Sequence, residues 1–355
     1  MNTEFLVPTG FIIKDYLDEL DINQKELSLR MGLSEKHLSN VLNGKSKLTE
    51  EFAIKLEKII HAAPASYWLN YETKYREYKT RNDLMNDIDK NELKELDQRF
   101  KFSSLFSELG LSLNEQANEM LKLLKISSFE QFNSVYANLK VNFMEDGGRI
   151  EPIATWLNLA EEEVIIQNVD LSEKKYDKKD LLASLDKLKL ITLNRDYKKS
   201  IQSARKFLNQ LGIYLVLQEA LPNSKVRGAL TTYRKNPAIF LSDRFKTHDH
   251  IWFALLHEIG HLIHHYPFKE AVVTMEADQE SVDRSEEEKK ANQFARDFFI
   301  NQTDYENFTS LNNFNKATIE QFANSQKVLP GIVVGRLQHD GYINFSDFNY
   351  LKNKE

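Results

Sequence analysis

The sequence predicts a multidomain, mainly α protein that contains one small α+β domain. Three observations predict this class. The first part of the chain alternates short helical apolar patterns with capping and turn residues. A long, heavily charged region with a helical period follows it. Near Lys199 the period changes to that of short strands, and two more helical patterns come after these strands.

The composition is that of an ordinary soluble protein. The chain has 355 residues, of which 41% are hydrophobic and 28% charged, with a net charge of −6. This charge argues against a protein that coats nucleic acid over its whole surface, so any DNA binding must be confined to one domain. The absence of cysteine excludes disulfides, thiol catalysis and Cys-type zinc sites. Because neither a signal peptide nor a long apolar run is found, we expect a cytoplasmic protein that does not contact a membrane.

The N-terminal domain, placed at residues 1–82, is predicted to be a bundle of short helices. Apolar residues recur at a helical period over residues 9–20. Each later helix has a capping residue in front of it or a turn or breaking residue behind it. The predicted caps are Asn23, Ser34 and Thr49, a fifth helix begins at Ser66, and the predicted stops are Gly32, Asn43-Gly44 and Pro64.

Residues 83–194 keep a helical pattern but contain no chemical motif, so we interpret them as a helical linker or scaffold. The next domain is placed at residues 195–305 and begins with a helix that ends at Gly212. Three predicted strands follow, IYLVL, VRGALTTYR and PAIFLS, with the polar turn RKN between the last two. A long helix over 247–265, a charged loop and a helix over 285–300 complete an α+β arrangement. Residues 306–355 are predicted to be a C-terminal helical extension, with a break at Pro330-Gly331.

The long helix carries the motif His257-Glu258-Ile259-Gly260-His261. Residues four apart lie on one helical face, so His257 and His261 can present two imidazoles to one zinc ion. Zinc lowers the pKa of a water towards about 7, and Glu258 can take the proton as a general base. Its apolar neighbours predict that the helix is mostly buried, where His and Glu side chains need partners. The alternative is a helix with two ordinary surface or core histidines.

A zinc site of this kind needs a third protein ligand. The segment EEEKKANQFARDFF contains Glu288, Ala291, Asn292 and Ala295 on one helical face, and the alanines permit a close approach to a second helix. We predict Glu288 as the third ligand and Asn292 as a residue that orients a ligand from behind. Gly260 is consistent with a tight helix crossing. The rival ligands are Glu280, Glu286 and Glu287, which can also be read as a solvated acidic run, and His264 and His265.

The pair HEIGH and E-x-x-A-N-x-F-A resembles the ImmA/IrrE family of zinc peptidases. The resemblance extends over roughly residues 195–345, including RGALTTYRKNPAIFLSDRFKTHDHIWFALL and LPGIVVGRLQHDG. It implies a zincin-like domain in which one zinc ion is held by His257, His261 and Glu288, with Glu258 as the catalytic glutamate. It also implies a metalloendopeptidase whose protein substrate is a helix-turn-helix repressor or antitoxin.

Residues 22–47 have the spacing of a helix-turn-helix and a local charge of +3, from five Lys or Arg against two acids between Gln24 and Lys47. They resemble the repressor-type helix-turn-helix family, and VPTGFIIKDYL with SYWLN resembles its HigA-type antitoxin branch. The resemblance implies double-stranded DNA as a partner. It further implies major-groove contacts from Glu35, Lys36, Ser39 and Asn40, and phosphate contacts from Gln24, Asn43, Lys45 and Lys47. A homodimer is expected, with a contact near Trp68, Leu69 and Tyr71.

Three functions compete at this point. The first is a DNA-binding zinc peptidase that regulates transcription, a toxin–antitoxin pair or a stress response by cleaving a repressor-like protein. The second is a HigA-like antitoxin or transcriptional regulator whose metal domain only senses or scaffolds. Glu258 favours the first, because a purely structural zinc site needs no base beside its ligands. A non-proteolytic hydrolase is the third.

Overall fold

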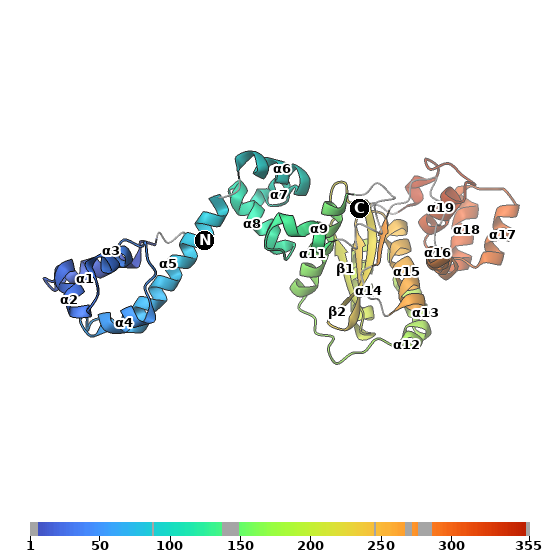
Figure 1. Cartoon of the computed structure of the whole chain (residues 1–355). Helices are drawn as coiled ribbons and strands as arrows, with labels where there is room; N and C mark the ends of the chain where they lie inside the picture. Colours follow the sequence, from blue (N-terminus) through green and yellow to red (C-terminus); the bar gives the residue numbers. More distant parts are fainter. Residues whose placement is uncertain are drawn as a thin grey trace. The chain divides into compact units, whose positions relative to one another are not determined.

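The computed structural model describes residues 6–86, 89–136, 149–244, 246–266, 272–275 and 286–352. The chain forms two compact units, Met1–Asn118 and Glu119–Glu355, which are described separately below. The class is mainly helical with one small sheet, as predicted (Figure 1). The domain boundaries placed at residues 82, 194 and 305 stay predictions.

The first unit begins with five helices, and three of them have the N-caps that the sequence predicts. The side chains of Asn23, Ser34 and Thr49 each accept a hydrogen bond from the backbone N–H three residues further on. Gly32 ends the second helix in the left-handed conformation, with φ of 65°. The helices are α1 (Thr9–Glu19), α2 (Gln24–Met31), α3 (Glu35–Leu42), α4 (Glu50–Glu57) and α5 (Ala65–Asn86).

One hydrophobic core joins these five helices. Leu27, Met31, Leu38 and Leu42 belong to it, and Leu33 packs at its edge. Trp68 is completely buried in the same core, against Tyr16. Trp68 itself therefore cannot contact a second chain, because its side chain has no exposed surface, and a homodimer contact through Leu69 and Tyr71 stays a prediction.

A buried carboxylate links α5 to the rest of this bundle, and the sequence does not predict it. Glu72 is only 4% exposed. It accepts hydrogen bonds from Thr9 Oγ1 at 2.5 Å, from the Leu48 N–H at 3.2 Å and from Arg76 Nε at 2.7 Å. Hydrogen bonds to a buried charged group are among the stronger ones in proteins, so Glu72 fixes the start of α1 and the turn after α3 against α5.

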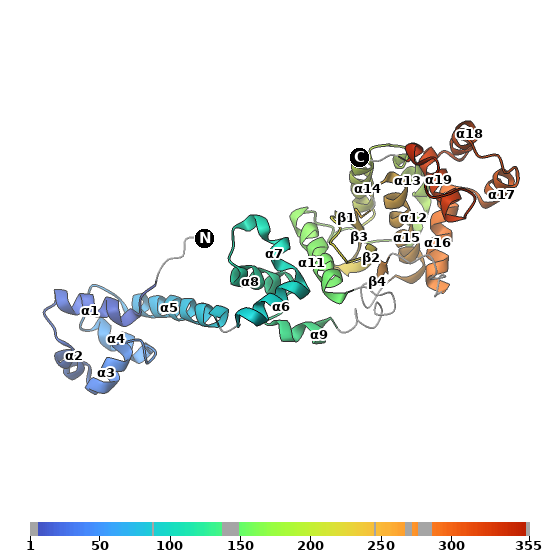
Figure 2. The same cartoon turned by 90° about the horizontal axis from the view of Figure 1, so that it is seen from above.

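The remaining helices before the sheet fall on both sides of the boundary between the two units, which lies within α8. Their bounds are α6 (Lys90–Phe100), α7 (Phe102–Leu105), η1 (Ser107–Leu109), α8 (Leu113–Leu123), η2 (Phe129–Gln131), α9 (Phe132–Val135), α11 (Ile150–Ile166), α12 (Lys178–Ala183), α13 (Leu185–Ile191) and α14 (Tyr197–Gln210). The apolar residues of α11 pack on one face of the sheet, and those of α12, α13 and α14 share the core on its other face (Figure 2). Much of the region interpreted as a linker or scaffold is thus built into the second unit.

A mixed sheet lies at the centre of the second unit. In the described residues its strands are β1 (Tyr214–Gln218), β2 (Val226–Tyr233), β3 (Asn236–Ser242) and β4 (Val272–Met275), in the order β1-β3-β2-β4. β1 runs parallel to β3, and the other two pairs are antiparallel. The turn between β2 and β3 places Arg234 and Lys235 at φ of 47° and 73°, the left-handed region that tight hairpins require.

The sequence predicted three of these strands and read the fourth, β4, as part of a charged loop. That reading was wrong. β4 has only four residues, and it is a strand because its backbone pairs with β2, a long-range partner that no local pattern reveals.

The helices that complete the unit are α15 (His248–His265), α16 (Glu286–Phe299), α17 (Gln302–Ser310), α18 (Lys316–Gln326), α19 (Pro330–His339) and η4 (Asn349–Leu351). Pro330 begins α19 instead of breaking a helix, because a proline in the first turn needs no N–H. Helix α17 was not predicted. None of the helices in the described ranges is long and apolar enough to cross a membrane.

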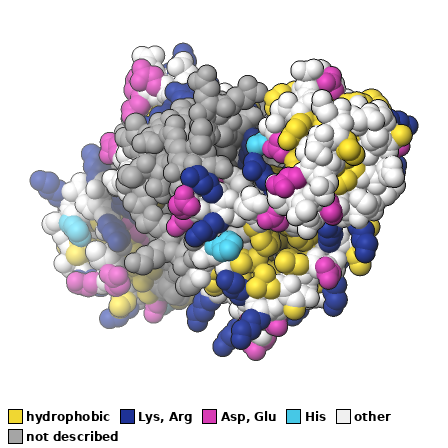
Figure 3. Space-filling view, turned by 90° about the vertical axis from the view of Figure 1, so that its right-hand side faces the viewer, with side chains coloured by type: hydrophobic (Ala, Val, Ile, Leu, Met, Phe, Trp, Pro, Cys, Tyr) yellow, Lys and Arg dark blue, Asp and Glu magenta, His cyan; other side chains and the backbone are white. Residues whose placement is uncertain are grey.

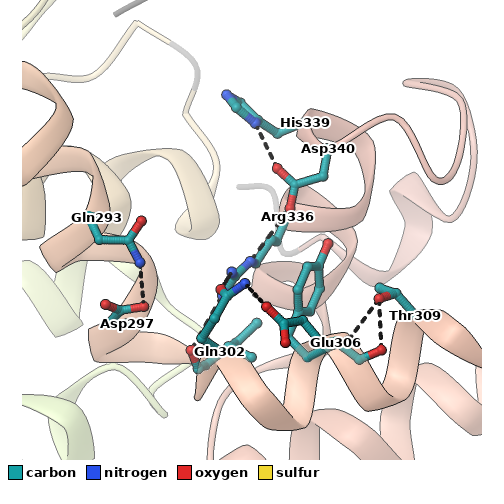
Figure 4. Close-up of polar contacts among 10 residues, drawn as sticks. Gln293, Asp297, Gln302, Glu306, Thr309, Arg336, His339 and Asp340 are labelled. Atoms are coloured by element: carbon teal, nitrogen blue, oxygen red, sulfur yellow. Dashed lines mark hydrogen bonds and ion pairs between the residues drawn. The ribbon is translucent and has the colours of Figure 1, made fainter.

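Arg336 links the helices that follow the metal motif (Figure 4). Its guanidinium lies over the Tyr305 ring at 3.9 Å and donates to Gln302 Oε1 at 2.6 Å and to the Ile300 carbonyl at 3.3 Å. The C-terminal segment is also fastened to α15, because Lys352 Nζ lies 2.9 Å from the buried Asp249 Oδ2. The outer face of these helices carries patches of hydrophobic side chains among charged ones (Figure 3), and the exposed ones of this region include Leu311, Tyr342, Phe345 and Tyr350.

Candidate metal centre

Two histidines stand one turn apart on α15, the helix that packs against the sheet. His257 and His261 are both buried, and their Nε2 atoms lie 3.0 Å apart. Leu255, Ile259 and Leu262 pack the rest of the helix into the core. Because the helix is packed into the core, the spacing of four residues places both imidazoles on the same face.

Glu288 reaches the same point from α16. Its Oε2 lies 3.3 Å from His257 Nε2, and its Oε1 lies 3.1 Å from His261 Nε2. The approach depends on the absence of a side chain at Gly260, where a Cβ would lie only 2.9 Å from the Ala291 Cα. The tight crossing and the alanine stripe that the sequence indicates are therefore present where α15 meets α16.

The spacing of these donor atoms fits a tetrahedral ion. Zinc binds nitrogen and oxygen ligands at about 2.0–2.1 Å, which puts the corners of its tetrahedron about 3.3 Å apart. The two Nε2 atoms lie 3.0 Å apart, and they lie 3.3 and 3.1 Å from different oxygens of the Glu288 carboxylate, which is close to this spacing. Among the described residues, His257, His261 and Glu288 form a group that can hold a metal ion. A cation stabilises this arrangement, in which two imidazole nitrogens and a carboxylate face one another.

Asn292 lies behind the first of these ligands. The Nδ1–H of His257 donates to Asn292 Oδ1 at 2.9 Å. This hydrogen bond turns Nδ1 towards Asn292 and leaves Nε2 facing the site, the ring orientation in which an unprotonated Nε2 can bind a metal. The contact between Asn292 and His257 is therefore present, and the role of Asn292 in orienting a ligand stays a prediction.

Glu288 is held in its charged form. Burial by itself raises the pKa of its carboxyl, but hydrogen bonds and charge from His257 and His261 outweigh burial and hold the pKa well below its usual range. A carboxylate that stays ionised near neutral pH is able to bind a cation.

Glu258, the predicted base, is completely buried. Its carboxyl packs against the backbone of Gly228 on β2, where a Cβ would lie 2.6 Å from Glu258 Oε1. Sequence reasoning did not identify Gly228. The available signal was a glycine inside a predicted strand, which often marks a close approach of another group.

The rival ligands do not reach the three donor atoms in the described part of the chain. Glu286, Glu287 and His264 are exposed, and the group that can hold a metal does not include them. Glu280 and the side chain of His265 lie outside the described residues.

The residues predicted to contact DNA gather on α2, α3 and the turn that follows. Glu35, Lys36, Ser39 and Asn40 lie on α3, and Gln24 opens α2. Asn43 caps the C-terminal end of α3, accepting from Lys14 Nζ at 3.0 Å and donating to Ser39 Oγ at 3.2 Å. The exposed Lys45 and Lys47 follow in the turn. The structure therefore brings these residues to one region of the bundle, and their DNA contacts stay predictions.

Comparison with known proteins supports the two halves separately. Residues 13–64 match a family described as helix-turn-helix, and residues 208–313 match the IrrE N-terminal-like domain. YddM of Escherichia coli (strain K12), an uncharacterized HTH-type transcriptional regulator, is 40% identical over 63 residues, 18% of this chain and 66% of that protein.

Other relatives match over similarly short stretches. Virulence-associated protein A' of Dichelobacter nodosus is 33% identical over 66 residues, 19% of this chain and 57% of that protein. An uncharacterized HTH-type transcriptional regulator of Haemophilus influenzae is 31% identical over 74 residues, 21% of this chain and 58% of that protein. The chain thus spans less than two thirds of the length of each of these relatives. It combines an N-terminal helix-turn-helix domain with a C-terminal domain of the IrrE N-terminal-like family, as its sequence motifs predict.

Proposed function

We propose that this chain is a DNA-binding zinc metallopeptidase that cleaves a helix-turn-helix repressor or an antitoxin-like protein. The observation that carries the proposal is the convergence of His257, His261 and Glu288 within 4.8 Å of one another, with Glu258 directly after the first ligand. Zinc suits this set because nitrogen and oxygen ligands in a tetrahedral arrangement are typical of catalytic zinc sites, which keep one position open.

Each side chain of the proposed site has a separate role in peptide hydrolysis. When bound, zinc supplies Lewis-acid catalysis that a carboxylate alone lacks. Glu258 takes a proton from the attacking water, whose oxygen adds to the peptide carbonyl carbon. The C–N bond then breaks, and Glu258 returns the proton to the leaving amine. Asn292 keeps His257 in the ligating tautomer, and the packed helix holds each group in place.

The helix-turn-helix domain gives the proposal its regulatory half. A local charge of +3 on residues 24–47 within an acidic chain supports attraction to DNA phosphates through this domain. The HTH-type regulator names of two relatives are in line with that role. We propose that the protein binds its operator as a homodimer, since helix-turn-helix domains of this type read paired half-sites.

Metal content tests the first half of the proposal. Full-length wild-type protein should carry about one zinc per chain, and His261→Ala should lose it, because two remaining ligands bind zinc far more weakly. Both proteins are measured by native mass spectrometry after incubation with zinc and buffer exchange. Lys289→Ala, a change on the exposed face of α16, serves as the control and should retain the metal. Zinc-free wild-type protein would instead favour a regulator whose C-terminal domain is not a peptidase.

Asn40→Ala tests the second half. Asn40 lies on α3, the helix proposed to read base edges, so this change should weaken specific DNA binding by about 1–3 kcal/mol and relax the preferred sequence. Operator sequences are first selected from a random double-stranded library, and affinities are then compared by fluorescence anisotropy at fixed salt. Zinc content should not change. Equal affinity and equal preference in the variant would contradict the proposed role of α3.

A further inference from the structure

Gly228 faces the metal helix and lies just beyond an irregularity in β2. Leu230 belongs to the core on the α15 side of the sheet, and side chains alternate along a strand, so position 228 points to the same side. The pairing of β2 with β4 shifts register between Val226 and Gly228, which leaves Arg227 as an extra residue. This bulge also explains why Val226 and Ala229, three positions apart, both pack on the α11 side.

The backbone of Gly228 is in direct contact with the side chain of Glu258. A Cβ at position 228 would lie 2.6 Å from Glu258 Oε1 and 3.2 Å from both its Cδ and its Cγ. The nearest atoms are therefore the outer part of the one side chain that the proposed mechanism uses as a base. No other residue type leaves this space open, because all others carry a Cβ.

We infer that Gly228, which leaves room for the side chain beside β2, is a residue that positions the Glu258 carboxylate. This inference rests on the proposed function. The backbone of Gly228 borders the carboxylate on one side, so the carboxylate lies between β2 and α15. These two elements are held in place by the sheet and the core. Gly228 acts through Glu258 and does not itself touch the substrate.

The consequence of adding a methyl group follows from the distances. In Gly228→Ala, Glu258 Oε1 must retreat by about 0.8 Å to restore ordinary van der Waals contact at 3.4 Å. The retreat costs little folding energy, because the end of a flexible side chain gives way instead of backbone. A displacement of about 1 Å at a catalytic group can nevertheless cost about 100-fold in rate.

The experiment compares full-length wild type, Gly228→Ala and the control Gly335→Ala. Gly335 lies on α19, and its added Cβ would meet Asp249 Oδ2 at 2.9 Å, a second carboxylate on α15 away from the proposed metal site. The substrate is the peptide that wild type cleaves best in a degenerate library. Gly228→Ala should keep about one zinc per chain and lose about 100-fold in kcat with little change in KM. Gly335→Ala should keep the wild-type kcat.

A double-mutant comparison shows whether the loss acts through Glu258. Glu258→Asp shortens the base by one methylene group and draws its carboxylate back from the new methyl group. In that background, Gly228→Ala should lower kcat by less than about threefold. An equal loss in both backgrounds, or a kcat for Gly228→Ala equal to that of wild type, would overturn the inference.

Crystal structures separate this inference from the proposed function. If wild type cleaves no peptide, the proposed function fails, but the position of the carboxylate can still be measured. The inference holds if Glu258 Oε1 moves away from β2 in Gly228→Ala while the strands stay in place. It fails if β2 moves and the carboxylate does not.

Discussion

Glu258→Gln should reduce peptide cleavage by about 10²- to 10⁴-fold, the usual contribution of a general base. The amide has nearly the same shape as the carboxylate, so it fits the space left by Gly228, but it cannot take a proton. None of the three predicted ligands changes, so the variant should still bind about one zinc per chain. Stability should not fall, because a neutral amide is easier to bury than a completely buried carboxylate.

The measurement is kcat on a library-selected peptide, taken together with zinc content and thermal unfolding. Glu287→Gln is the matched control, since it makes the same chemical change at an exposed glutamate beside the predicted ligand. It should cleave at the wild-type rate. If Glu258→Gln cleaves as fast as wild type with its zinc in place, Glu258 is not the base, and the proposed mechanism is wrong.

The parts of the fold that the sequence predicts depend on neighbouring residues. Asn23, Ser34 and Thr49 cap helices through hydrogen bonds to residues three positions away, so a local pattern is sufficient to find them. The spacing of His257 and His261 places both on one face for the same reason. The position of Glu288 near the two histidines is indicated less directly, by a stripe of alanines on one face of α16 and by the family resemblance.

The parts that were missed depend on contacts distant in sequence. The four residues of β4 become a strand through pairing with β2, more than 40 positions earlier in the chain. Glu72 looks like one more charge on a polar helix, and its burial follows from contacts with Thr9 and Leu48. The contact of Gly228 with Glu258 exists only because α15 packs on β2 in the folded structure. In each case the tertiary structure supplies a partner that local propensity cannot reveal.

A second large effect is expected where α15 and α16, the helices that carry the predicted ligands, approach each other most closely. In Gly260→Ala the new Cβ would lie 2.9 Å from the Ala291 Cα and 3.2 Å from its carbonyl oxygen. These are backbone atoms, so α15 and α16 must separate by several tenths of an ångström. That separation moves Glu288 away from His257 and His261 and stretches the hydrogen bond from His257 to Asn292. Zinc affinity should fall by about 10- to 100-fold, the loss that is usual when a metal ligand loses the residue that orients it.

Stability should change far less than zinc affinity in this variant. Replacing a helical glycine by alanine gains about 1 kcal/mol of helix propensity, while overpacking costs about 1–3 kcal/mol, so the two effects partly cancel. The decisive comparison is zinc titration against thermal unfolding of the metal-free protein, with Gly335→Ala as the control whose added methyl group meets only a side-chain oxygen. A Gly260→Ala protein that binds zinc as tightly as wild type would mean that the crossing distance does not set the metal centre, and that Glu288 can follow the histidines when the helices separate.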